Sequence, residues 1–189
     1  MTMYKTVWNK CQSSVCQLNF YSSSGIKLLS MTGFKVNDQY LITDDNVLKI
    51  LKGVKVKIVF VNPDGYTENK SVEISMEELK RRIVKGTEKE KAGFTAVNID
   101  FDEFKDIPSL KLSKDKNNDI GQNIAVLGYQ LDHENLSIKT GIISSTFVDD
   151  DGLKFLQVES NINQGNSGSP LINTETGEVI GIIGQNLTS

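Results

Sequence analysis

Ser167 is the residue best placed in this sequence to do covalent chemistry. It lies in a run that starts at Gly165 and reads G-N-S-G-S-P, between a strand-like segment at 154–158 and an apolar segment at 171–173. A tight loop between strands exposes a serine hydroxyl and turns main-chain N–H groups toward a developing oxyanion. We therefore predict that Ser167 is a nucleophile and that Gly165, Asn166 and Ser167 form its oxyanion hole. A polar turn without chemistry would have the same composition, because Gly, Asn and Ser dominate turns.

The surroundings of this serine exclude the α/β-hydrolases. Their nucleophile elbow reads G-x-S-x-G and is followed along the chain by the catalytic histidine. Here the fifth position is Ser169, and the single histidine of the chain, His133, precedes the serine. This one histidine limits the catalytic mechanisms that are open to Ser167.

Five segments, in the same order, resemble trypsin-like serine proteases of the HtrA branch. They are M-T-G-F-K-V at 31–36, I-P-S-L-K-L at 107–112, D-I-G-Q-N-I-A-V-L-G-Y at 119–129, T-G-I-I-S at 140–144 and the loop around Ser167. The resemblance covers nearly the whole chain and implies an all-β, trypsin/chymotrypsin-like fold of two β-barrels. It also implies an N-terminal barrel at 1–106 and a C-terminal barrel at 107–189, which together form one protease domain.

Hydrophobic periodicity predicts the same fold class from the residues alone. Many short strands at regular spacing, with Gly and Asn turns between them, are typical of an all-β barrel or sandwich. The predicted strands are 14–21, 27–36, 40–43, 54–62, 95–99, 123–128, 137–147, 154–159, 171–173 and 179–183. A short helix is predicted at 47–51. Another is predicted at 76–82, after a capping box, with an irregular strand as the alternative. Segment 101–109 has no period and is interpreted as a linker.

The resemblance fails at the two other positions of the catalytic triad. The family's histidine lies in L-T-N-A-H-V-V, and the corresponding segment 41–48 has Asn46 in that position. The family's acid opens the strand D-x-A-x-L, and the corresponding segment 94–99 begins with Phe94. Asn is not a usable base near neutral pH, Phe cannot orient one, and a serine hydroxyl without a base is a weak nucleophile.

Other bases for the serine find little support in the sequence. An acid at Asp100 or Asp102, then His133, then the serine would imitate the order of subtilisin. His133 lies in a polar turn flanked by acids, however, and the helical histidine motif of subtilisin is absent. Asp44 or Asp45 would be a weak base, and both are better suited to cap the helix that follows. The S-x-x-K spacing of Ser-Lys catalysis is also absent.

The sequence therefore favours a catalytically inactive protease homologue, a pseudoprotease retained for binding or regulation. The resemblance implies that an extended peptide or protein partner adds as a β-strand to the edge formed by Ile182, Ile183, Gly184 and Gln185. The pocket residue six positions before Ser167 would be Asn161, which favours a small or polar side chain. The alternative is an active serine endopeptidase with an unrecognised base or a site completed by a partner.

Composition and charge narrow the partners further. Acidic and basic residues are mixed along a chain of net charge −3, so no basic stripe indicates nucleic acid. No run of 18 apolar residues predicts a membrane span. No motif predicts a metal or a cofactor. Because HtrA proteins carry a binding domain after the protease domain, the resemblance implies a further domain or partner chain beyond Ser189.

The N-terminus and the cysteines lead us to expect a cytoplasmic protein. Residues 1–10 lack the apolar segment of a secretory signal. Cys11 and Cys16 do not make a disulfide framework. Cys16 lies in an apolar alternating run and is predicted to be a reduced core residue.

Overall fold

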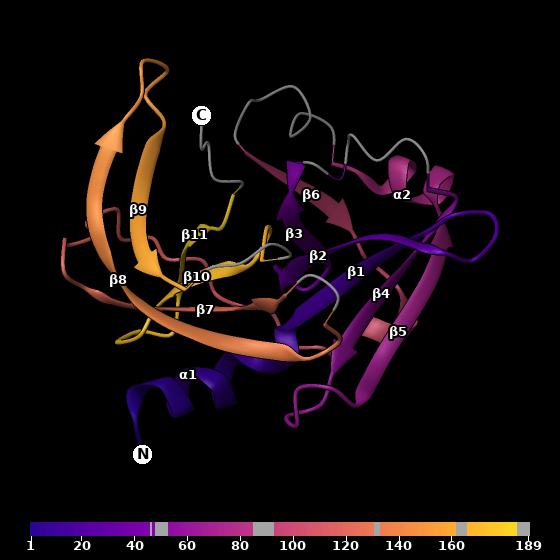
Figure 1. The fold of residues 1–189 in the computed structure, drawn as a ribbon, viewed down its shortest axis with the longest axis horizontal. Helices are drawn as coiled ribbons and strands as arrows, with labels where there is room; N and C mark the ends of the chain where they lie inside the picture. Colours follow the sequence, from indigo (N-terminus) through magenta and orange to yellow (C-terminus); the bar gives the residue numbers. More distant parts are fainter. Residues whose placement is uncertain (46, 48–52, 85–92, 131–132, 162–165, 185–189) are drawn as a thin grey trace.

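Two antiparallel sheets, each curled on itself, form the computed structural model of the protein (Figure 1). The structure describes residues 1–45, 47, 53–84, 93–130, 133–161 and 166–184. Strands β1 to β6 make the first sheet and β7 to β11 the second, so the chain completes one sheet before it starts the next. This arrangement confirms the predicted all-β fold with short helices.

The first sheet has six strands in the order β5-β4-β1-β2-β3-β6. They are β1 (Val15–Tyr21), β2 (Lys27–Val36), β3 (Tyr40–Asp44), β4 (Lys55–Val61), β5 (Glu68–Ser75) and β6 (Phe94–Asn98). In β1, Cys16, Leu18 and Phe20 alternate with polar residues and are fully buried in one core cluster. A bridge between Ile83, which follows β5 and α2 (Met76–Arg82), and Val97 in β6 links the two ends of this sheet.

The second sheet has five strands in the order β11-β10-β7-β8-β9. They are β7 (Asn123–Tyr129), β8 (Leu136–Val148), β9 (Lys154–Ser160), β10 (Pro170–Asn173) and β11 (Val179–Ile182). Its own core is smaller and contains Ile124, Val126, Ile143, Leu171 and Ile183. Strands β8 and β9 form a long hairpin at the side of the molecule (Figure 1).

An apolar cluster with members from both sheets holds them together. It includes Phe34 from β2 and Leu127 from β7. Helix α1 (Met3–Cys11) packs on the same cluster through Val7 and Cys11, which lie one turn apart. The sequence analysis missed α1 because two apolar positions one turn apart are a weak periodic signal.

The connection between the sheets is fastened to β2 by a buried lysine. Lys35 is 2% exposed, and its ammonium group donates to the carbonyls of Phe104 and Ile107 at 2.8 and 2.7 Å. Burial lowers the pKa of Lys35. The linker interpreted at 101–109 is therefore an ordered segment, and it includes a short 3-10 helix, η3 (Asp102–Phe104).

Most of the predicted elements are confirmed to within one or two residues. Helix α2 begins after Ser75, whose hydroxyl accepts from the N–H of Glu78 at 3.1 Å, so the helical interpretation is right. The sequence analysis missed β5, because most of its residues are polar and partly or fully exposed. Apart from Val47, the helix predicted at 47–51 lies outside the described residues.

Both cysteines are buried and unpaired, which confirms the prediction for Cys16. Burial raises the pKa of both thiols, that of Cys11 to about 11. The two thiols are therefore protonated at neutral pH, which makes them poor nucleophiles and metal ligands.

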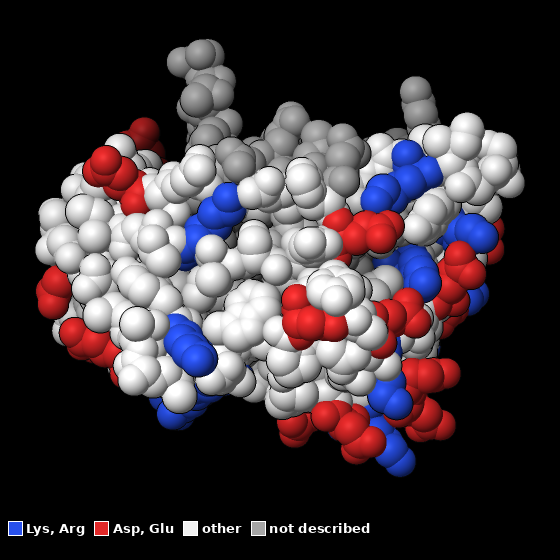
Figure 2. Space-filling model, turned by 60° about the horizontal axis from the view of Figure 1, so that its bottom comes forward, with Lys and Arg blue, Asp and Glu red and all other residues white. Residues whose placement is uncertain are grey.

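The described surface carries no dominant charge on the face drawn in Figure 2. Acidic and basic side chains are interspersed there, with uncharged surface between them. Within the described ranges, no helix has the length and apolar content to cross a membrane. No group of three or more His, Cys, Asp and Glu residues is arranged to hold a metal ion in that part of the chain.

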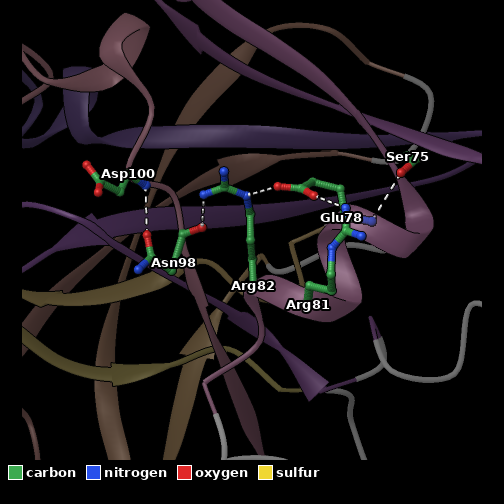
Figure 3. Close-up of polar contacts among 6 residues, drawn as sticks. All are labelled: Ser75, Glu78, Arg81, Arg82, Asn98 and Asp100. Atoms are coloured by element: carbon green, nitrogen blue, oxygen red, sulfur yellow. Dashed lines mark hydrogen bonds and ion pairs between the residues drawn. The ribbon is translucent and has the colours of Figure 1, made fainter.

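A charge cluster fastens α2 to the end of β6 (Figure 3). Glu78 accepts from the guanidinium of Arg81 and from Nε of Arg82, the latter at 2.7 Å. Arg82 also donates to the carbonyl of Asn98 at 3.3 Å and lies 4.0 Å from the centroid of the Phe101 ring. Hydrogen bonds from Arg81 and then Arg82 hold the pKa of Glu78 below its ordinary value.

Replacing Glu78 with Gln should therefore destabilise the fold in a pH-dependent way. Because the folded pKa of Glu78 is lowered, its stabilisation is complete above the ordinary value of 4.5 and is lost as the pH falls through the folded pKa. We expect Glu78→Gln to lower the Tm by about 1–3 °C at pH 7 and by less in acid. The measurement is thermal unfolding at a series of pH values, with the exposed Glu175→Gln as control. A difference in Tm that persists in acid would show that packing, not charge, is responsible.

Candidate active site

Ser167 lies at the corner of a tight turn between β9 and β10. The N–H of Ser169 donates to the carbonyl of Asn166 at 2.9 Å, which closes the turn. Gly168 has a φ of +87°, the left-handed conformation that the third residue of a type II turn requires. Ser167 is half-buried, whereas Asn166 and Ser169 on either side of the corner are fully buried. The two residues that flank the corner are thus held in the interior, whereas Ser167 remains accessible to solvent.

Gly168 is the point where this turn meets the first sheet. A Cβ atom at Gly168 would lie 2.0 Å from the carbonyl oxygen of Thr32 and 2.8 Å from Oγ1 of Thr43. It would also lie 3.0 Å from the main-chain nitrogen of Asp44. Only glycine leaves room for the turn to approach the end of β3 so closely.

Thr32 in β2 ties the serine turn to both sheets. Its N–H donates to the carbonyl of Ser167 at 3.1 Å, and its Oγ1 accepts from the N–H of Tyr129 at 3.0 Å. Its carbonyl accepts from the hydroxyl of Thr43 at 2.8 Å. One fully buried residue therefore connects the turn with β2, β3 and β7.

The side chains of two turn residues lie against β7. Asn166 donates from Nδ2 to the carbonyl of Tyr129 at 2.7 Å. Ser169 replaces the second glycine of the G-N-S-G-G-P motif, and its side chain lies over Gly128, where a Cβ atom would be 2.0 Å from Oγ of Ser169. Because Gly128 has no side chain, β7 leaves room for the side chain of Ser169, which the motif lacks.

Phe94 has the position predicted for the catalytic acid. The end of β3 lies between it and the serine turn. Phe94 is the first residue of β6 and pairs with Asp44, the last residue of β3. Because Asp44 borders Gly168, the start of β6 belongs to the same corner as Ser167. A phenylalanine there has no oxygen to orient an imidazole or to stabilise its charge.

Asn46, Gly165 and Gln185 lie outside the described residues. Asn161, the predicted pocket residue, is exposed and directly follows β9.

The main-chain N–H and C=O of Ile183 are both bonded to the serine turn and are therefore not available to a peptide. Its N–H donates to the carbonyl of Ser169 at 2.9 Å, and its carbonyl accepts from the N–H of Gly168 at 2.8 Å. Main-chain groups of successive residues in an extended strand point to opposite sides. Those of Ile182 and Gly184 are therefore directed away from β10, and these two residues are the ones that a docked peptide would meet.

His133 lies on the surface, in the turn between β7 and β8. Its carbonyl accepts from Nε2 of Gln17 in β1 at 2.9 Å. Tyr129, at the start of this turn, bonds to both Thr32 and Asn166. The end of β7, which leads into the turn of His133, is therefore attached to the corner that holds Ser167.

The sequence analysis did not single out Thr32, Gly128 or Tyr129. All three lie in segments that carried the resemblance, 31–36 and 119–129, so the signal was present. Their roles depend on contacts between segments far apart in the chain, such as the 97 residues that separate Thr32 from Tyr129. A motif read along the chain does not contain such contacts.

Comparison with known proteins decides the family. The model described as "Trypsin-like peptidase domain" matches residues 31–182. The chain belongs to the trypsin-like peptidase domain family. A relative of this trypsin-like domain in Halomonas elongata, named "Probable periplasmic serine endoprotease DegP-like", is 33% identical over 163 residues, which cover 83% of this chain and 29% of the relative. A protein of the same name from Pseudomonas savastanoi pv. phaseolicola is 32% identical over 144 residues, or 68% of this chain and 28% of the relative.

The solved structure named "HtrA-type protease AlgW with tripeptide" has the same fold as this trypsin-like domain. The TM-score is 0.72 at 19% sequence identity, over 95% of this chain and 53% of that one. Together with the DegP-like relatives, it confirms the predicted HtrA branch and double-barrel fold. The chain spans less than a third of the length of these two DegP-like relatives.

The expectation of a cytoplasmic protein is wrong by the same comparison. The DegP-like relatives are named periplasmic endoproteases. The expectation rested on residues 1–10, which lack a signal-like segment, and on cysteines that form no disulfide. Neither observation reports where a folded trypsin-like domain works.

The close approach of the serine turn to Thr32 leaves no room for a methyl group at position 168. Gly168→Ala places a Cβ against the Thr32 carbonyl and should destabilise the fold by at least about 3 kcal/mol. Gly152→Ala is the matched control, because Gly152 has a similar φ of +80° but nothing within 4 Å of its Cβ position. The control should cost about 1–2 kcal/mol from backbone strain alone. Chemical denaturation measures both, and equal losses would contradict the contact.

Proposed function

We propose that this trypsin-like domain is a pseudoprotease that keeps the family's serine turn but binds extended peptides without hydrolysing them. The observation that carries the proposal is the residue at the start of β6. Phe94 pairs with Asp44 beside the serine turn, and the resemblance assigns its position to the catalytic carboxylate. Asn46, in the position of the histidine, is the second change.

The chemistry follows from what the two replaced residues would have done. Without a base, the hydroxyl of Ser167 keeps its proton and attacks a carbonyl poorly. In a working protease, removal of the triad leaves only about 10³–10⁴-fold acceleration over water, from the oxyanion hole and substrate binding. Both changes act on the same proton transfer, so one cannot compensate for the other.

A fluorophosphonate probe tests the reactivity of Ser167 directly. We expect the folded protein to be labelled no faster than heat-denatured protein, because no base withdraws the hydroxyl proton. The measurement is intact mass spectrometry over time, with Ser167→Ala as the control for labelling elsewhere. Fast, stoichiometric labelling of Ser167 would overturn the proposal.

An active serine endopeptidase is the second candidate, because the chain keeps the family's serine turn and carries a histidine, His133, before it. The same probe separates the two candidates. If wild-type protein labels fast and His133→Ala labels slowly, His133 is the base. If both label fast, the base lies elsewhere or is supplied by a partner.

Peptide binding would use the main-chain groups of Ile182 and Gly184, with Asn161 at the pocket for the adjacent side chain. The name of the AlgW structure includes a bound tripeptide, which supports a peptide-binding role for this fold. The names of the relatives support a periplasmic location. We retain 1–106 and 107–189 as the two barrels, because β1 to β6 and β7 to β11 form separate sheets.

Rebuilding the triad provides a further prediction. Asn46→His alone should leave the protein inactive, because the second ring nitrogen of the new imidazole would face Phe94, and loss of the carboxylate costs about 10⁴ in turnover. Asn46→His combined with Phe94→Asp should restore trace hydrolysis. The measurement is casein cleavage, with Ser167→Ala added to each variant as control. Robust cleavage by the single variant would show that another residue already orients the base.

A further inference from the structure

Two Asp-Gly pairs occupy equivalent positions in two hairpin turns of this protein. One is Asp64 with Gly65, between β4 and β5, and the other is Asp151 with Gly152, between β8 and β9. In each turn the glycine N–H donates to the carbonyl three residues earlier, at 2.9 Å for Gly65 and 3.0 Å for Gly152. Both glycines have a left-handed φ, of +85° and +80°. The two turns thus share these backbone features, and their surroundings are what distinguishes them.

An Asp-Gly pair is a place where a polypeptide can rearrange without an enzyme. The main-chain nitrogen of the glycine attacks Cγ of the aspartic acid, so that a C–N bond forms while the C–OH bond breaks. The hydroxyl group leaves as water with the proton of the nitrogen. The resulting succinimide ring takes up one water and opens either to aspartate or to isoaspartate, in which the main chain runs through Cβ and Cγ. Glycine favours the attack because it has no side chain to hinder the approach.

Asp64 is held against this reaction by its neighbours. Its carboxylate accepts from the N–H groups of Tyr66 and Thr67 at 2.9 and 2.8 Å, and from the hydroxyl of Thr67. These hydrogen bonds, with those from Thr67 first, lower the pKa of Asp64, so the protonated acid that the attack requires is scarce. Gly65 is buried, and its carbonyl accepts from the N–H of Leu136 at 2.7 Å. Both reacting residues of this pair are therefore fixed.

Asp151 and Gly152 lack these restraints. Both are exposed at the tip of the hairpin that projects from the second sheet (Figure 1). No described residue donates to the carboxylate of Asp151 or forms an ion pair with it, and a Cβ atom at Gly152 would have nothing within 4 Å. The carboxylate of Asp149 holds the turn instead, because it accepts from the N–H groups of Asp151 and Leu153 at 3.0 and 2.8 Å. The carboxyl group of Asp151 is therefore free to approach the nitrogen of Gly152.

We propose that Asp151 is a site of spontaneous isomerisation, at which the folded protein forms a succinimide with Gly152 and then isoaspartate, whereas Asp64 stays intact. The rearrangement adds one carbon atom to the main chain in the turn that joins β8 to β9. Next to this turn, the rings of Phe147 and Phe155 stack with their centroids 5.0 Å apart. The tip of the long hairpin thus changes covalently as the protein ages. The proposal does not depend on the reactivity of Ser167.

Peptide mapping of the folded protein provides the first test. Trypsin releases the two Asp-Gly pairs in separate peptides, residues 58–70 and 140–154. The protein is incubated at about pH 6 in water labelled with heavy oxygen, and each succinimide that opens leaves one heavy atom in its peptide. We expect label and isoaspartate to accumulate in peptide 140–154 at least about tenfold faster than in peptide 58–70. Equal rates in the two peptides, or no label in peptide 140–154, would overturn the proposal.

Incubation in concentrated urea separates the effect of the fold from that of the sequence. Unfolding removes the hydrogen bonds to the Asp64 carboxylate and exposes Gly65. We therefore expect the two peptides to take up label at rates within about threefold of each other. A tenfold difference that persists in urea would assign the selectivity to the neighbouring sequence and contradict the argument from the structure.

Two variants locate the reacting bond. Gly152→Ala puts a methyl group in the path of the attack and should slow labelling of peptide 140–154 at least about tenfold, with no effect on peptide 58–70. Asp150→Glu is the matched control: it changes the neighbouring acid, keeps the pair of Asp151 and Gly152, and should leave the rate within about twofold. Fragmentation of the peptide by electron transfer should place the isoaspartate at position 151. Unchanged labelling in Gly152→Ala, or isoaspartate at position 149 or 150, would overturn the proposal.

Discussion

The hydrogen bond from the N–H of Thr32 to the carbonyl of Ser167 is the contact on which the arrangement of this protein depends. The same threonine binds Tyr129 through its side chain and Thr43 through its carbonyl. Strands from both sheets and the serine turn thus meet at one buried residue. A polar residue is tolerated in such a place because its main-chain groups and its side-chain oxygen all have partners.

The loss of catalysis proposed above is compatible with this arrangement, because the serine turn also has a structural role. The turn does more than present a hydroxyl, because Gly168 and Asn166 fill the junction between the sheets. A change at either residue would disturb the fold whether or not Ser167 reacts. The position of the catalytic acid carries no such structural role: Phe94 is a half-buried residue at the start of β6, the last strand in the order of the first sheet. The turn is therefore under structural constraint, and the position of Phe94 is much less so.

The sequence predicted the parts of this structure that local chemistry determines. Alternation identified β1 and β4, and the Ser75 cap identified α2. Alternation did not identify β5, which depends on β4 for its pairing and offers few buried apolar residues of its own. The sequence also could not predict that Ile183 is used by the serine turn, because that bond depends on how β10 and β11 meet. Sequence motifs located the candidate site, but they did not predict the contacts around Thr32, which depend on how distant segments fold together.

Hydrolysis of casein by the wild-type protein and by Ser167→Ala tests the central claim most directly. The claim is that the fold retains the serine turn without a base to activate it. The account predicts that the two proteins, at equal concentration and with equal thermal stability, release peptides at the same rate as buffer alone. Cleavage by the wild type that Ser167→Ala abolishes would contradict the account and show that this corner of the molecule is a working active site.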